Sequence, residues 1–441
     1  MAELRSRPLV PAAPTARPTR PGGPLPPGAL IVGIALGVQG LTTYGFLVIT
    51  HRALGDTAYS PLSVLWALVF VAAPGLFLPL EQEVGRAASA RRVAGHGAGP
   101  LVRRALLLGI GLALVVMVVA AAANGPLVDQ LFKGDGWLLV GFLVAVACYA
   151  VYYLSRGTLA GAGRFGGYAS VLVVEGAVRV TAALILWRLG VTDAAAYGLA
   201  IALPCLVGLT VVLPRQRGIA APGPPAHWNE LTSALGWLLT GSLLAQALAN
   251  ITPLTTQALF SGTDPTAAGR VLNGLVVARI PLFLFQAIQA GLMPKLSSDA
   301  AAGQFEEFWA LLRRLLLLIA AVVVISVAGM ALLGPPVVQL LFPSSHPLGR
   351  GDLVLLALGS EGLMVALALA YASIALRGYR GATAGWVAGS AALVVALVLL
   401  PGTLIRVEVA FCIAVAVASA VMAIGLRIRL RDRRGVPPSG G

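Results

Sequence analysis

The sequence predicts an all-α, polytopic membrane protein with about twelve transmembrane helices in two six-helix lobes. Three observations lead to this fold class. Hydrophobic residues make up 58% of the 441 residues and charged residues only 11%, whereas a soluble domain carries about 25% charge. Apolar runs long enough to cross a bilayer recur along the chain. Short patterns of the first half also return in the second half.

The internal repeat indicates how the two lobes are related. Residues 101–104 (LVRR) open an apolar run in the first half, and residues 311–314 (LLRR) open one in the second. Residues 125–132 (GPLVDQLF) recur as residues 334–342 (GPPVVQLLF). An even number of spans in each half gives both lobes the same orientation in the membrane. Such a parallel repeat is typical of transporters that open alternately to each side.

The apolar runs define the predicted spans and domains. A transmembrane helix needs about 20 apolar residues, and we predict spans at 29–50, 60–80, 103–123, 136–155, 168–188, 194–213, 234–257, 267–293, 314–333, 353–374, 383–400 and 408–426. The predicted domains are a disordered Pro/Arg-rich tail (1–28), an N-lobe (29–213), a linker (214–233), a C-lobe (234–428) and a basic tail (429–441). The other loops are too short to form a soluble catalytic domain.

The distribution of basic residues predicts the orientation. With the N-terminus in the cytoplasm, 23 of the 31 Lys and Arg residues lie on the cytoplasmic side and five lie outside. We therefore expect a multi-pass protein of the bacterial plasma membrane, with the N- and C-termini in the cytoplasm. The net charge of +14 lies in loops and tails that alternate across the membrane. No nucleic-acid recognition module is readable, so we expect no nucleic-acid partner.

The sequence predicts no enzymatic activity, no cofactor and no metal site. It contains no phosphate-binding loop, no pair of histidines at metal-ligand spacing and no carboxylate cluster on the predicted outer face. Its three cysteines lie inside apolar runs, where we interpret them as small packing residues.

Polar residues within two spans suggest a substrate path. In the seventh span, Gln246, Asn250 and Gln257 follow one another at helical spacing and share a face. In the first span, Gln39 and Thr43 lean to one side in a similar way. We predict that these side chains bind substrate in a water-filled cleft between the lobes. The alternative is that they form hydrogen bonds between helices within a lobe.

Arg279 is the sharpest candidate for an anion-binding residue. It lies in the middle of the eighth span, with Gln286 seven residues later on the same face. The guanidinium fork of a buried arginine can bind a phosphate through two hydrogen bonds, although a structural ion pair is the alternative. Arg52, just after the first span, could attract an anionic headgroup at the outer mouth or anchor the helix at the interface.

Three further charges within spans have candidate roles. Glu175 and Arg179 are four residues apart in the fifth span, so they can form an ion pair, and proton coupling through Glu175 is the alternative. Glu361 in the tenth span has no partner nearby in the sequence. It could pair with Arg279 or titrate.

A charged cluster follows the second span at the predicted cytoplasmic face. It comprises Glu81, Glu83 and Arg86. We interpret it as a cytoplasmic gate or as a solvated helix end.

Several short motifs resemble one transporter superfamily. They are residues 54–56 (LGD), 59–66 (YSPLSVLW) and 74–76 (PGL), the charged pair Glu81 and Arg86, the repeated segments at 125–132 and 334–342, and residues 163–165 (GRF). With these motifs the chain resembles a polysaccharide-type lipid flippase of the multidrug/oligosaccharidyl-lipid/polysaccharide (MOP) exporter superfamily.

The resemblance implies a V-shaped pair of six-helix lobes and an activity. Such a protein moves a polyprenyl-(pyro)phosphate-linked glycan from the inner to the outer leaflet by alternating access. The implied partners are the lipid-linked glycan, membrane lipids, and glycosyltransferases or other envelope-synthesis proteins. The alternatives are a small-molecule or drug exporter of the same fold, and a non-transporting scaffold in an envelope-synthesis complex.

One departure from the superfamily affects the expected branch. In the peptidoglycan-precursor branch, a charged pair would fall near Phe46 and Leu47, which are apolar here. The sequence therefore places the chain away from that branch.

Overall fold

The fold was examined in a computed structural model that describes residues 28–232, 235–402 and 404–434. The described secondary structure is helical and contains no strand. In the first half, the helices are α1 (Ala29–Val93), α2 (Gly99–Ala122), α3 (Asn124–Pro126), the π-helix η1 (Leu127–Leu131), α4 (Gly136–Gly161), α5 (Phe165–Arg188), α6 (Ala194–Ala202), α7 (Pro204–Val212) and the short 3₁₀ helix η2 (Leu213–Arg215). In the second half, they are α8 (Asn229–Thr232), α9 (Leu235–Phe260), α10 (Ala267–Ala278), α11 (Ile280–Ala301), α12 (Phe305–Leu341), α13 (Arg350–Ala375), α14 (Tyr379–Leu399) and α15 (Leu404–Arg434).

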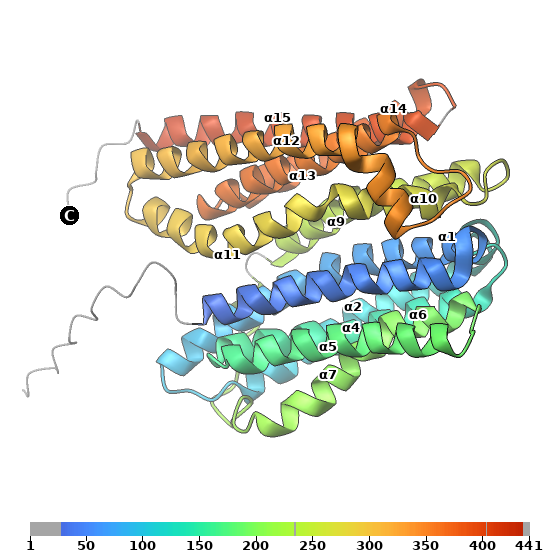
Figure 1. Ribbon diagram of the computed structural model, residues 1–441. Coiled ribbons are helices and arrows are strands. Elements are labelled where there is room, and N and C mark those ends of the chain that lie inside the picture. Colours follow the sequence, from blue (N-terminus) through green and yellow to red (C-terminus); the bar gives the residue numbers. More distant parts are fainter. Residues whose placement is uncertain (1–27, 233–234, 403, 435–441) are drawn as a thin grey trace, which may run out of the picture.

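Helix α1 contains the first two spans, joined by a single residue. Gly55 has φ 67° and ψ 174°, a conformation that is essentially restricted to glycine. The chain reverses there, so the two halves of α1 run side by side (Figure 1). As one straight helix, its 65 residues would be about 98 Å long, far more than a bilayer is thick. The predicted loop between the first two spans is thus replaced by a one-residue turn.

The predicted number of spans is confirmed. Ten helical segments of the described chain are long and apolar enough to cross a membrane. The segment Leu30–Val93 supplies two crossings because of its reversal, and α10 with α11 supplies the eighth span. The sixth span consists of α6 and α7, which meet at Leu203 just before Pro204.

The helices form two groups, as Figure 1 shows. Helices α1 to α7 lie together, and α9 to α15 form the second group. Helix α1 packs on α4 and α5 within the first group and on α9 and α10 of the second, so it forms most of the contact between the lobes. The first and last described helices begin and end at the same end of the molecule, which we call the terminal end, and the opposite end is the distal end. The exact domain boundaries stay predictions.

Close approach of α1 and α4 positions the polar groups of the N-lobe. A Cβ atom on Gly157 would lie 2.5 Å from the backbone oxygen of Glu81, and one on Gly161 would lie 2.8 Å from that of Gly85. Small residues of this kind allow transmembrane helices to pack at short distance. As a result, side chains from α1 and α4 reach one another inside the lobe.

Candidate functional site

Arg279 lies at a break in the eighth span. Helix α10 ends at Ala278 and α11 begins at Ile280, with Arg279 between them at φ −91° and ψ 3°. Pro281 follows in the first turn of α11. Proline has no amide hydrogen and cannot continue the hydrogen-bond ladder of the preceding helix. Transporters commonly place substrate groups at such discontinuous helices near the middle of the membrane.

The guanidinium of Arg279 is incompletely satisfied. Its Nη1 donates a hydrogen bond of 3.3 Å to Oδ1 of Asn250. Its Nε and Nη2 are buried and have no hydrogen-bond partner among the described residues. The phenol of Tyr44, from the N-lobe half of α1, is its electrostatic neighbour. Asn250 in turn donates to the carbonyl oxygens of Gln246 (3.0 Å) and Phe70 (3.4 Å). Arg279 therefore lies at the contact between the lobes and forms no ion pair with a described residue.

Two other buried arginines differ from Arg279 because each faces a carboxylate. Arg179 forms an ion pair with Glu175, as their spacing predicts, and the two side chains are 2% and 0% exposed. Arg156 lies 3.2 Å from Glu81, and both side chains are 8% exposed. Removing a charge from water costs several kcal/mol unless a partner compensates for it. Only the charge of Arg279 lacks such compensation among these three.

Gln39 and Thr43 belong to the network around Arg179. Nε2 of Gln39 donates to Glu175 at 2.9 Å. Nη1 of Arg179 donates to Oγ1 of Thr43 at 3.3 Å, and its Nη2 donates to the hydroxyl of Tyr149 at 2.8 Å. Substrate binding by Gln39 and Thr43 in a cleft between the lobes stays a prediction. Their polar atoms satisfy the buried ion pair inside the N-lobe, which was the alternative interpretation.

The predicted cytoplasmic gate residues separate into two environments. Glu81 is buried within the N-lobe, where it accepts a hydrogen bond of 2.7 Å from the hydroxyl of Tyr168. Glu83 forms an ion pair of 2.7 Å with Arg86, which also donates to the carbonyl of Glu230 in α8. The grouping of the three residues is thus wrong, because Glu81 points inward to Arg156.

Arg52 and Gln257 lie at the distal end and join the lobes there. Arg52 donates to the carbonyl oxygens of Leu340 (2.7 Å) and Leu341 (3.3 Å) at the end of α12. The Ser60 hydroxyl of α1 donates to Oε1 of Gln257 in α9 at 3.4 Å. Arg52 is eight residues beyond Tyr44, about 12 Å along α1, so the structure does not bring Arg52 to Arg279.

Two more side chains complete these contacts between the lobes at the distal end. The Ser344 hydroxyl donates to Asp56 at 2.8 Å. Lys133 donates to the carbonyl of Pro265. Together with the hydrogen bonds of Arg52 and Gln257, these contacts join the two lobes at the distal end.

Of the remaining predicted site residues, Glu361 does not join Arg279. Glu361 is buried in α13, near Ser326 of α12, and it forms no ion pair with Arg279. The suggested pairing of these two residues is therefore wrong. Glu361 lies beside Ser326, whereas Arg279 is bonded to Asn250. The side chain of Gln286 lies outside the described part of the chain.

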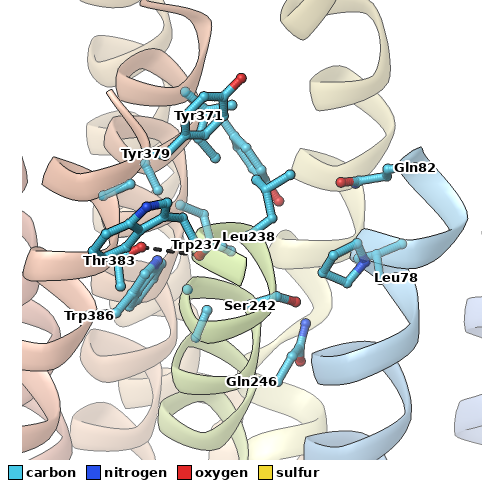
Figure 2. A pocket seen from close by; sticks show the side chains of 17 residues that line it. Leu78, Gln82, Trp237, Leu238, Ser242, Gln246, Tyr371, Tyr379, Thr383 and Trp386 are labelled. Atoms are coloured by element: carbon cyan, nitrogen blue, oxygen red, sulfur yellow. Dashed lines mark hydrogen bonds between the residues drawn. The ribbon is translucent and has the colours of Figure 1, made fainter. Parts of the chain in front are cut away.

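A cavity opens toward the terminal end, between α1 and the C-lobe helices α9, α13 and α14 (Figure 2). It encloses about 640 Å³ of empty space, its open mouth included. Gln246 is the only predicted substrate-binding residue among the described residues that line it. Two tryptophans and two tyrosines form much of its wall: Trp237, Trp386, Tyr371 and Tyr379.

Sequence reasoning missed some of these residues for identifiable reasons. Arg156 directly follows the predicted span 136–155, which assigns it to the cytoplasmic charges, although it is buried. Trp237 and Trp386 fit the aromatic belt at a membrane interface, which hides their convergence on one cavity. Tyr44 follows Thr43 directly, but a position one residue along a helix points in a different direction.

The sequence of this chain matches a known protein family and two related proteins. The profile of the family described as "Lipid II flippase MurJ" matches residues 98–346, more than half of the chain. An uncharacterized protein of Mycobacterium tuberculosis strain H37Rv is 27% identical over 402 residues, which cover 88% of each chain. An uncharacterized protein of strain CDC 1551 / Oshkosh matches with the same identity and coverage.

Solved structures with the same fold are multidrug transporters. An inward-facing multidrug resistance MATE family transporter of the MOP superfamily aligns with a TM-score of 0.73 at 14% identity, covering 94% of this chain and 99% of that one. An outward-facing structure of a transporter with that description aligns with a TM-score of 0.66 at 14% identity, covering 93% and 96%. These similarities confirm the predicted fold class.

The family match overturns one expectation. The sequence placed the chain away from the peptidoglycan-precursor branch because Phe46 and Leu47 are apolar, and both are indeed buried. That argument used a single helix, whereas Arg279, from another helix, supplies a positive charge next to Tyr44 of the same α1. The chain is a multi-pass membrane flippase or transporter rather than an enzyme, and it belongs to the MurJ lipid II flippase family within the MOP superfamily.

Proposed function

We propose that this protein moves a polyprenyl-phosphate- or polyprenyl-pyrophosphate-linked glycan from the inner to the outer leaflet by alternating access. The observation that carries the proposal is the uncompensated guanidinium of Arg279 at the contact between the lobes. A buried charge of this kind is unfavourable in the empty protein. An anionic phosphate would supply the missing partner and could accept two parallel hydrogen bonds from the guanidinium fork.

The arrangement of the lobes supports loading from one side. Several side-chain hydrogen bonds join the lobes at the distal end, whereas beside the aromatic cavity the lobes are joined by the Ser242 hydroxyl, which donates to the carbonyl oxygen of Pro74 at 3.3 Å. The excess of Arg and Lys at the terminal end predicts that this end faces the cytoplasm. In this arrangement, the headgroup enters from the cytoplasmic leaflet, where precursors are made, while the polyprenyl tail remains in the bilayer. Opening the distal end would then release the headgroup outside.

Reconstitution into liposomes tests the proposal. The measurement is the appearance of a labelled polyprenyl-pyrophosphate glycan in the opposite leaflet. We expect Arg279→Gln to reduce transport roughly 30-fold or more, because truncating one partner of a buried charge pair costs about 2–5 kcal/mol. Arg279→Lys should retain part of the activity, since it keeps the charge but loses the fork.

The matched control is Arg188→Gln, which removes an exposed arginine from the last turn of α5. This variant should transport at the wild-type rate. Undiminished transport by correctly inserted Arg279→Gln would contradict the role of Arg279. Transport of an organic cation, with none of the glycolipid, would replace the proposal with a drug-export function.

A further inference from the structure

We infer that the aromatic cavity between α1, α9, α13 and α14 is a carbohydrate subsite that holds a sugar ring of the transported headgroup. The inference rests on the proposed function, because it assigns a second part of the same substrate to a second part of the same site. The cavity has about 640 Å³ of empty space, open mouth included, and its lining comes from α1 and three helices of the C-lobe.

The walls of the cavity match the two chemical surfaces of a sugar. Trp237, Tyr371 and Tyr379 converge on one side, from three different helices (Figure 2). The face of an aromatic ring carries partial negative charge, so it packs favourably on the C–H face of a pyranose. The side chains of Gln82 and Gln246 lie on the other side of the cavity (Figure 2). Carboxamides both donate and accept hydrogen bonds, as the hydroxyl groups of a sugar require.

The charges near the cavity disfavour a cationic ligand. The guanidinium of Arg380 lies over one face of Trp237, 5.5 Å from the ring centroid, so a ligand would have to pack on the opposite face of this ring. None of the described lining residues is acidic. A cationic drug would therefore meet positive charge and find no carboxylate. A neutral or anionic ligand encounters neither obstacle.

The polar groups of the lining differ in whether they need a ligand. The hydroxyls of Ser242 and Thr383 already donate to the carbonyl oxygens of Pro74 (3.3 Å) and Trp237 (3.2 Å). The carboxamides of Gln82 and Gln246 also line the cavity. A lipid tail would deprive these two carboxamides of hydrogen bonds with water, whereas the hydroxyl groups of a sugar would replace those bonds.

The cavity connects directly to Arg279 through α9. Gln246 lines the cavity, and Asn250 lies one turn further along, about 6 Å away. Asn250 donates to the carbonyl of Gln246 and accepts the hydrogen bond from Arg279. A phosphate at Arg279 would thus place the sugar bonded to it next to Gln246. Trp237 lies nine residues from Gln246, about 14 Å along α9. The aromatic wall would therefore hold a sugar further along the glycan, and the two features form the two ends of one site.

Binding to the full-length protein in lipid nanodiscs tests this inference with two probes. One is farnesyl pyrophosphate, and the other is the same pyrophosphate carrying a linear chain of three N-acetylglucosamine units, which is long enough to extend from Arg279 toward Trp237. We expect the wild-type protein to bind the glycosylated probe more tightly. Trp237→Leu should reduce that preference about 3- to 10-fold, the range expected for one aromatic contact. It should leave the affinity for farnesyl pyrophosphate unchanged, and Trp237→Phe should restore most of the preference.

Controls separate the sugar contact from a general effect on folding. Trp187→Leu removes an exposed tryptophan near the distal end of α5 and should bind both probes like the wild type. Gln82→Leu changes an exposed residue on the opposite wall, and it should reduce the same preference. If Trp237→Leu fails to fold, Gln82→Leu and Trp237→Phe decide the question in the same assay.

The possible failures have different signatures. The sugar subsite is overturned if the wild type has no preference for the glycosylated probe, or if the Trp237 and Gln82 variants keep the full preference. It is also overturned if those variants weaken both probes equally. The proposed function fails instead if Arg279→Gln binds both probes as tightly as the wild type. In that outcome, loss of the preference in Trp237→Leu would still establish a glycoside site.

Discussion

At the scale of single residues, Arg156, Arg179 and Arg279 show how position within the fold assigns different roles to one residue type. Arg179 and Arg156 are neutralised by Glu175 and Glu81 inside the N-lobe. Arg279 has a neutral amide as its hydrogen-bond partner and lies where the lobes meet. The first two therefore stabilise the lobe, whereas the third is available to a ligand.

The Glu175–Arg179 pair gives a prediction about stability. Glu175→Gln should reduce the free energy of unfolding by about 3–5 kcal/mol, because it leaves the buried charge of Arg179 unpaired. The double variant Glu175→Leu/Arg179→Leu should be less destabilised than the single variant, since it leaves no buried charge. Denaturant unfolding in detergent micelles measures both values. A double variant less stable than Glu175→Gln would contradict a mainly electrostatic role for the pair.

Helical spacing showed which polar residues share a face of a helix, but not always which lobe that face contacts. The spacing of Glu175 and Arg179 on one helix was enough to predict their pairing. Gln39 and Thr43 lie on α1, which contacts helices of both lobes. Helical periodicity defines a face of a helix, but it does not identify the helix that packs against that face. Their contacts with Glu175 and Arg179 therefore required the tertiary structure.

At the scale of elements, helix α8 fastens the segment between the lobes to the end of α1. The carboxylate of Glu230 accepts hydrogen bonds from Nε (2.8 Å) and Nη2 (3.0 Å) of Arg91. The backbone amide of His227 donates to the same carboxylate at 2.7 Å. The hydrogen bond from Arg91 is the main reason that the pKa of Glu230 falls from its ordinary value of 4.5 to about 2.

This contact predicts how docking of α8 depends on pH. Because the pKa is lower in the docked state, the stabilisation is fully present above pH 4.5 and is lost as the pH falls toward about 2. Hydrogen exchange of residues 220–231 should therefore be slow at about pH 6 and faster, after correction for intrinsic rates, at about pH 3. Glu230→Gln should show the faster corrected exchange at both values. Equal protection in the variant and the wild type would contradict the role of this carboxylate.

Hydropathy predicted the number of spans but not the full length of the helices. Helix α12 runs from Phe305 to Leu341, whereas the predicted span covered 314–333. Similarly, α1 continues to Val93, beyond the predicted end of the second span at residue 80. Apolar length reports only the part of a helix that lies in hydrocarbon. A helix can continue beyond the hydrocarbon into water, because its backbone hydrogen bonds form within the helix itself.

At the scale of the whole molecule, the contacts at the distal end should limit the movement of one lobe against the other. Cysteines at Asp56 and Ser344, whose side chains are 2.8 Å apart across the lobes, would allow this to be tested. The three native cysteines would first be replaced by alanine: Cys148, Cys205 and Cys412. A short thiol-specific crosslinker should then reduce transport in proportion to the crosslinked fraction, and a cleavable version should restore it.

A second crosslinked pair provides the control. Asp264 and Arg270 form an ion pair within the C-lobe at the same end of the molecule. Crosslinking cysteines at these two positions leaves the lobes free to separate, so transport should continue. Full transport after complete crosslinking of positions 56 and 344 would show that the distal contacts need not open.

The turn at Gly55 also decides where a probe or an epitope can be attached. Because one residue reverses the chain, this hairpin has no slack that could accommodate an inserted peptide. An insertion there would separate Arg52 from Asp56, which contact the end of α12 and the loop that follows it. In the segment between α12 and α13, residues 342–349, the exposed Pro347 is a more tolerant position for a fluorescent label than Ser344, which bonds to Asp56. Single-molecule measurements of lobe movement should therefore place their distal dye in that segment.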